Sequence, residues 1–235
     1  YLVGECYVLD NKEAFAPKYF IDAFTAYPRD PFAALALMRA GETFLYRHQL
    51  DGWLMQLDTL STNTPAGADA LAIARAGVLL RAGRIDDADA AFDTVRLASL
   101  SPAMRGYALA LKAGILREQG NLEDAIANAA EAADVAAAEQ FGLDEALFQL
   151  ARSLETAGQF QDAEGVYARL LSETVIPNNR VNAAALVGRA HCLVELGRLT
   201  EVIALCDDAT KLRPGHEIQA QALLPKGDAA FAMND

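Results

Sequence analysis

The sequence is poor in the residues and motifs that build redox or cofactor chemistry. It contains three cysteines, Cys6, Cys192 and Cys206, and no two of them have CxxC spacing. This excludes a disulfide framework and a zinc site, while a single disulfide, and with it the redox compartment, stays open. The motifs GxxxxGK[ST], GxGxxG, HExxH and GxSxG are all absent, so we expect no catalytic residue, no cofactor and no metal site.

Positive charge and long apolar runs are also scarce. The chain has 20 Lys and Arg against 32 Asp and Glu, for a net charge of −12. The imbalance lies mostly in residues 119–235, which carry −10, whereas residues 1–118 carry −2. An acidic chain repels phosphate backbones, so we expect no nucleic-acid partner. No run of about 18 apolar residues exists, so we expect no membrane span.

Apolar residues, alanine above all, are abundant. Hydrophobic residues make up 53% of the 235 residues, which is enough for a continuous core. Alanine loses no side-chain entropy in a helix, so this composition favours helices.

A pattern of small and aromatic residues recurs along the chain. It begins within "GECYVLDNKEAFAPKYFIDAFTAYP" (4–28) and returns 37 residues later. The matched positions are Gly4 and Gly41, Tyr7 and Phe44, Ala16 and Trp53, Phe20 and Leu57, Ala23 and Leu60, Pro28 and Pro65. Four further copies share one frame around the predicted turn glycines Gly83, Gly120, Gly158 and Gly197. Such a period indicates a stacked repeat protein.

The pattern resembles that of the tetratricopeptide repeat family, whose unit is a pair of antiparallel helices, A and B. The copies here lie 35 to 39 residues apart, somewhat more than the usual unit of this family. The resemblance implies an all-α fold, a right-handed α-solenoid of about six helix-turn-helix repeats plus a terminal helix, forming a single domain over residues 1–235. The predicted repeats span 1–30, 31–67, 68–103, 104–140, 141–179 and 180–215, and the terminal helix spans 217–233.

In this family helix A lines a concave face that binds partners. The repeat frame places a set of candidate partner-binding residues on that face: Leu35, Met38, Glu42, Leu45, Tyr46, Ile73, Leu80, Arg81, Phe148 and Arg152. The apolar members would form a groove for a protein or peptide partner, such as an amphipathic helix. If the frame is off by one position, the same residues belong to the core.

The resemblance implies a non-catalytic protein-interaction scaffold. The alternative is a regulatory or assembly module of a longer protein whose activity lies outside this chain, and self-association through the repeat ends is a third hypothesis. The stretch "FTAYPRDPFAALALMRAGETFL" (24–45) is similar to a pattern of bacterial envelope members of the family. It favours the periplasm or cell envelope over the cytoplasm without fixing the compartment.

Two further features have structural interpretations. The run "DDADAAFD" (86–93) lacks the glycine and glutamate of a calcium loop, so we expect its aspartates to open a helix B, next to the positive end of the helix dipole. Cys6 and Cys192 occupy the same slot of helix A, and we expect both to be buried, inert thiols.

Overall fold

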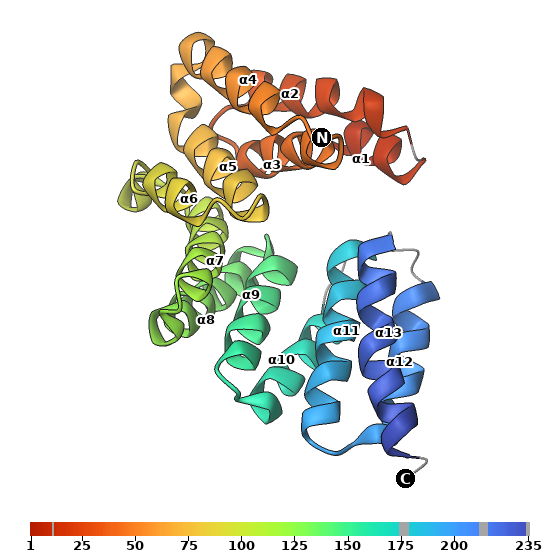
Figure 1. Cartoon of the computed structure of the whole chain (residues 1–235). Helices are drawn as coiled ribbons and strands as arrows, with labels where there is room; N and C mark the ends of the chain where they lie inside the picture. Colours follow the sequence, from red (N-terminus) through yellow and green to blue (C-terminus); the bar gives the residue numbers. More distant parts are fainter. Residues whose placement is uncertain (11, 174–178, 212–215, 234–235) are drawn as a thin grey trace.

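The computed structural model describes residues 1–10, 12–173, 179–211 and 216–233 (Figure 1). These residues form thirteen α-helices and no strand, which confirms the all-α solenoid predicted from the sequence. The helices are α1 (Leu2–Leu9), α2 (Ala16–Ala26), α3 (Pro31–Tyr46), α4 (Leu50–Asn63), α5 (Ala68–Arg81), α6 (Ile85–Phe92), α7 (Pro102–Glu118), α8 (Leu122–Glu139), α9 (Leu143–Thr156), α10 (Phe160–Glu173), α11 (Asn179–Glu195), α12 (Leu199–Lys211) and α13 (His216–Ala232). Short 3-10 helices cover Glu13–Phe15, Pro65–Gly67 and Leu97–Ser99.

The helix order gives pairs from α1/α2 to α11/α12, followed by α13 as a terminal helix. The division into repeats at the boundaries given above stays a prediction, and residues 212–215, at the end of the sixth predicted repeat, lie outside the described residues.

Local capping explains where two of the longer helices begin. Asp30 precedes α3, and its carboxylate accepts a hydrogen bond of 2.9 Å from the backbone N–H of Phe32. Ser101 precedes α7 in the same way, with Met104 N–H as donor at 3.3 Å. Both helices carry proline at their first position, where its missing N–H costs nothing.

The turns inside the pairs depend on positive backbone φ angles. Gly83, Gly120, Gly158 and Gly197 have φ between 72° and 83°, which confirms them as turn glycines. His48 takes the equivalent position two residues after α3 with φ 56°, so the second pair places a non-glycine residue in this strained region.

Small residues of one helix meet large residues of the next, as the repeat pattern predicts. A side chain at Gly41 would overlap Trp53, which is fully buried, and one at Gly188 would overlap the buried ring of Tyr167. Asp86 and Asp87 lie in the first turn of α6, which confirms the helix-start interpretation.

The expectation for one of the two cysteines is wrong. Cys192 is buried, whereas Cys6 is exposed. The reason is that α1 packs on α2 through the buried Gly4, where any side chain would overlap the ring of Phe20, while Cys6, two residues later, lies on the exposed side of α1.

Candidate functional site

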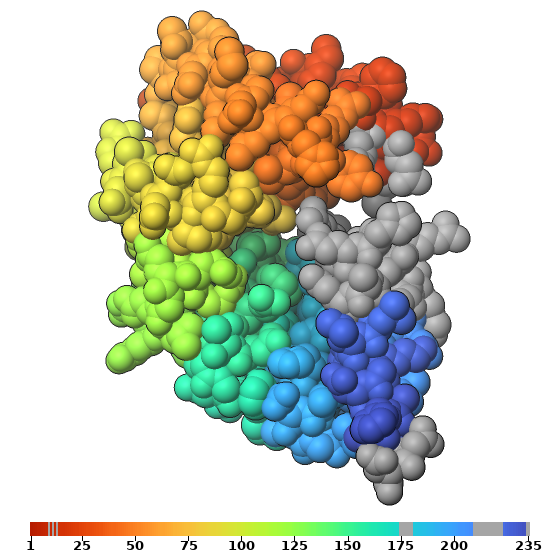
Figure 2. Space-filling view, in the orientation of Figure 1, coloured from red at the N-terminus to blue at the C-terminus, as the bar shows by residue number. Residues whose placement is uncertain are grey.

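The odd-numbered helices form the inner face of an arc (Figure 1). From α3 to α13 they contact one another in succession, while each even-numbered helix packs on its odd-numbered neighbours. In the space-filling view, the red and orange N-terminal helices join the yellow and green ones without a break along one edge (Figure 2). The inner face is therefore the surface on which the predicted partner-binding residues have to be located.

In the N-terminal half, neighbouring inner helices interlock through two glycines. Any side chain at Gly77 of α5 would overlap Met38 of α3 and lie 3.6 Å from Leu111 of α7. Gly114 of α7 leaves room in the same way for Leu80 of α5. Helices α3 and α7 consequently contact each other across α5. The glycines thus allow tight curvature, and side chains of the chain itself fill this part of the inner face.

This packing determines how far the predicted apolar groove residues are exposed to solvent. Met38 and Ile73 are only 3% and 0% exposed, so a partner cannot reach them in this structure. Leu35, Leu45 and Leu80 are half-buried against the core. Of the apolar and aromatic candidates in this half, Tyr46 is open to solvent, with 75% exposure.

The predicted charged residues of this half hold one another. Arg39 donates a bidentate pair of hydrogen bonds to Glu5, at 2.9 and 2.8 Å, and a third bond of 2.7 Å to Glu42. Arg81 pairs with the second oxygen of Glu42 at 2.9 Å. Burial alone would lower the pKa of Arg39, but its bonds to Glu5 and Glu42 raise it instead. These charges are used for contacts between helices.

An aromatic contact joins the second helix pair to the fifth. Phe141, in the turn before α9, packs edge-on against Phe32 of α3 with ring centroids 4.9 Å apart. Its other neighbour is Tyr107 of α7, at 6.3 Å. Gln140 and Gly142 on either side have φ angles of 53° and 69°, and this pair of left-handed residues directs Phe141 into the cluster. We call this contact the Phe141 latch.

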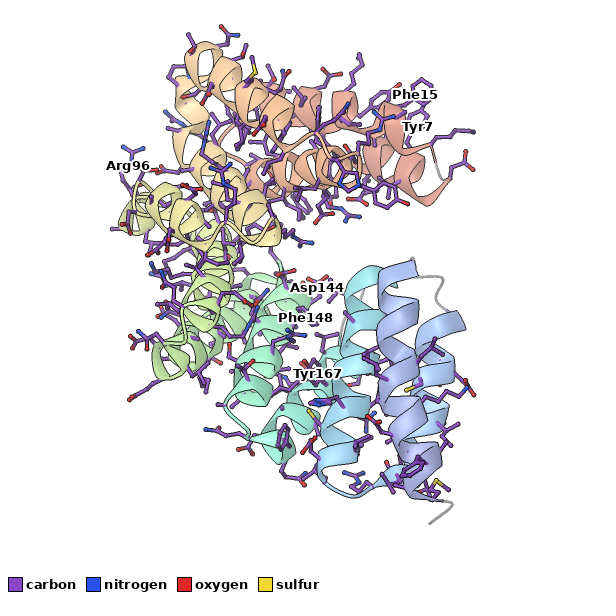
Figure 3. All side chains as sticks on the ribbon, viewed as in Figure 1. Tyr7, Phe15, Arg96, Asp144, Phe148 and Tyr167 are labelled. Atoms are coloured by element: carbon purple, nitrogen blue, oxygen red, sulfur yellow. The ribbon has the colours of Figure 1, made fainter. Side chains whose placement is uncertain are left out.

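The two predicted residues of the C-terminal half, Phe148 and Arg152, are both accessible to solvent. Phe148 of α9 is half-buried, with its ring 6.4 Å from that of Tyr167 (Figure 3). Arg152 follows one turn later, is exposed, and makes no side-chain hydrogen bond or ion pair within the described part of the chain. The structure therefore brings these two predicted residues together as neighbours on one accessible helix face.

A polar cluster lies beside this pair. Glu155 of α9 accepts a hydrogen bond of 2.6 Å from the Tyr167 hydroxyl, and its other oxygen lies 3.0 Å from Nδ1 of His191 on α11. Burial alone would raise the pKa of Glu155, but the bonds from His191 and Tyr167 lower it. The hydrogen bond to Glu155 raises the pKa of His191 in turn. Glu155 is thus an ionised partner for His191.

The other chemistry of the described residues is limited. Burial raises the pKa of the Cys192 thiol to about 12, which keeps it protonated and unreactive at neutral pH. Groups of three or more His, Cys, Asp or Glu able to hold a metal ion are not found in the described ranges. None of the described helices combines the length and the apolar composition that crossing a bilayer requires.

Comparisons with known proteins agree with this architecture. Residues 148–217 match the family model described as "Tetratricopeptide repeat". A crystal structure of a tetratricopeptide repeat protein from Parabacteroides merdae is similar to this chain with a TM-score of 0.54 and 16% identity, over 97% of this chain and 90% of that one. Comparison with curated protein sequences gave no match. Residues 148–217 thus match the tetratricopeptide repeat family, and the structural similarity shows that the described chain as a whole has the solenoid fold of such a protein.

Proposed function

We propose that this chain is a non-catalytic scaffold that binds a peptide or helix of a partner protein on the inner face of its C-terminal half. Tetratricopeptide repeats typically mediate protein–protein interaction without catalysis. The observation that carries the proposal is the pair of Phe148 and Arg152 on α9, an aromatic ring beside an unpaired cation. Aromatic and arginine side chains are the types that most often dominate binding energy at protein interfaces.

The N-terminal half supports this location by contrast. Its inner face is filled by Met38 and Leu111 around Gly77, and its arginines are engaged with Glu5 and Glu42. A partner protein would have to displace those contacts in order to bind there. On α9, Arg152 has no ion pair within the described residues that binding would have to break.

The experiment is affinity capture from lysate of the source cells, followed by mass spectrometry. The baits are the native chain, an Arg152→Glu variant and an Arg105→Glu variant. Arg105 is a matched control, because it is also exposed and unpaired but lies outside the inner-face slots. We expect a protein that the native and Arg105→Glu chains retain and the Arg152→Glu chain loses. Equal capture by all three baits would place binding elsewhere.

A second candidate is self-association through α13. This helix exposes Leu223, Leu224 and Phe231 by 64%, 71% and 72%, and the space beside Gly227 is empty for at least 4 Å. Such a stripe of apolar residues is suited to covering by a second copy of the chain. Sedimentation over a concentration series tests this, with Leu224→Glu as the variant expected to remain monomeric. A native chain that is monomeric at every concentration would disprove it.

A further inference from the structure

Three side chains of α9 stand one helical turn apart on its inner side. They are Asp144, Phe148 and Arg152, an acid, an aromatic ring and a base in that order. Figure 3 shows Asp144 and Phe148 on the side of α9 that faces α11. Eight residues of α-helix span about 12 Å, so the two opposite charges flank the ring by about 6 Å on each side. We call this set the α9 stripe.

Within the described residues, neither charged side chain of the α9 stripe forms an ion pair with another side chain. Asp144 has no cation at ion-pair distance in this part of the chain. Its carboxylate is stabilised by the backbone N–H groups of Glu145 and of Asp144 itself, and less by the charge of Arg39, which Glu5 and Glu42 already hold. Arg152 likewise has no ion pair there. Its charge attracts the nearby Glu155, whose two oxygens are bonded to Tyr167 and His191.

The surroundings of Asp144 disfavour the ionised form of its carboxyl group. Its carboxyl is half-buried, and burial together with the neighbouring Glu145 raises its pKa. A cation supplied from outside would offset that effect, and an anion could form an ion pair with the exposed Arg152. Glu145, next to Asp144, accepts a hydrogen bond of 2.8 Å from the Gln149 side chain.

We propose that the α9 stripe receives an amphipathic helix of a partner protein, with a basic residue on Asp144, an apolar residue on Phe148 and an acidic residue on Arg152. This inference rests on the proposed function and specifies the chemistry of the partner. A helix lying along α9 has the same rise per residue, so side chains at i, i+4 and i+8 reach all three positions together. The order of charges then fixes the direction: base first means parallel to α9, and acid first means antiparallel.

The inference predicts which charge pattern binds best. The probes are three fluorescent, end-capped 18-residue helical peptides that carry Lys-Leu-Glu, Glu-Leu-Glu or Lys-Leu-Lys at i, i+4 and i+8 of one face. Binding to the native chain is measured by anisotropy at about 150 mM salt, where screening over about 8 Å suppresses the general attraction of a chain of charge −12 for basic peptides. We expect the Lys-Leu-Glu peptide to bind at least about fivefold more tightly than the other two.

Variants of the stripe should switch this preference. Asp144→Arg makes both charges positive, so the Glu-Leu-Glu peptide should become the tightest ligand. Arg152→Asp makes both negative and should favour the Lys-Leu-Lys peptide. Arg105→Asp is the control and should leave all three affinities unchanged. The milder Asp144→Asn and Arg152→Gln variants serve the same purpose if a charge reversal impairs folding, and each should reduce the preference for Lys-Leu-Glu.

The outcomes separate this inference from the proposed function. If native chain and stripe variants bind the three peptides alike, or bind none of them, the inference is overturned. The proposed function is judged independently by Arg152→Glu in the capture experiment and by Phe148→Glu, which should weaken whichever peptide binds. If Phe148→Glu leaves peptide binding unchanged, both proposals fail.

Discussion

In four of the inner helices, the residue directly after a small residue of the repeat pattern differs between the two halves of the molecule. In α5 and α7 it holds Gly77 and Gly114, whereas in α9 and α11 it holds Arg152 and His191. The glycines let side chains from the flanking helices meet across them, which closes the N-terminal part of the inner face. The longer polar side chains of the C-terminal half instead project from it. In α5 and α7 the absence of a side chain at this position thus allows the inner face to be packed by neighbouring helices.

The largest expected effect comes from removing the Phe141 latch. Phe141→Ala should lower the free energy of unfolding by about 3 kcal/mol, because a buried ring that packs on Phe32 and Tyr107 is lost and leaves a cavity. Urea unfolding measures this, and small-angle scattering should show a more open arc. Phe15→Ala, which removes a ring that is 61% exposed, is the control and should change stability by less than about 0.5 kcal/mol. Equal losses in both variants would show that the latch has no special role.

The glycine interlock can be tested next. Gly77→Leu should cost about 2 kcal/mol, since a side chain there overlaps Met38 and crowds Leu111. The counterpart is Gly165→Ala in α10, where nothing lies within 4 Å of the new methyl group. That variant should gain about 0.5–1 kcal/mol from helix propensity alone. Thermal or urea unfolding of both variants checks the contrast, and a Gly77→Leu chain as stable as the native one would disprove the interlock.

Two arginines sharpen the comparison of charges. Arg39→Met should destabilise the chain by about 1–2 kcal/mol, because it leaves the half-buried Glu5 without its partner. Arg152→Met should change stability by less than about 0.5 kcal/mol, since the exposed guanidinium has no ion pair to lose. Denaturant titration of both variants measures this. Similar losses would mean that Arg152 also serves the fold.

The smallest expected effect depends on pH. The hydrogen bond to Glu155 raises the pKa of His191 above its ordinary value of 6.5, so protonated His191 stabilises the folded chain. That stabilisation is fully present below about pH 6.5 and is lost as the pH rises through the raised pKa. Because His191 is 48% exposed, we expect only about 0.5 kcal/mol.

His191→Gln removes this contribution, so the native chain should exceed the variant in stability at pH 6 and match it at pH 8.5. The gap should not close between pH 6 and pH 5, because the pKa of Glu155 is lowered and its carboxylate stays ionised there. Urea unfolding at the three pH values measures the difference. A gap that is constant from pH 5 to 8.5 would show that the histidine ring acts through packing.

Much of the candidate site could be predicted from the repeat frame, but its accessibility could not. The frame located Phe148 and Arg152 as neighbours, and it assigned Met38 and Ile73 to equivalent slots of the inner face. The structure buries the latter pair, and Gly77, one turn after Ile73, admits side chains from the inner helices of the preceding and following repeats. The sequence shows Gly77 and Gly114 at inner-face positions of their repeats. Because glycine has no side chain, these two positions could have predicted the close packing of neighbouring inner helices. Asp144 and the Phe141 latch had no such signal.

The sequence by itself determined the all-α solenoid, the turn glycines and the alternation of small and bulky residues between paired helices. These features depend on contacts within a helix pair or between neighbouring pairs, and short periodic patterns encode such contacts directly. The tertiary structure alone decided which part of the inner face is closed. That property depends on curvature, which accumulates over several repeats until Phe141 reaches Phe32. The sequence pattern of a single repeat does not specify the accumulated curvature. Which residues of the inner face are buried therefore follows only from the fold of the whole chain.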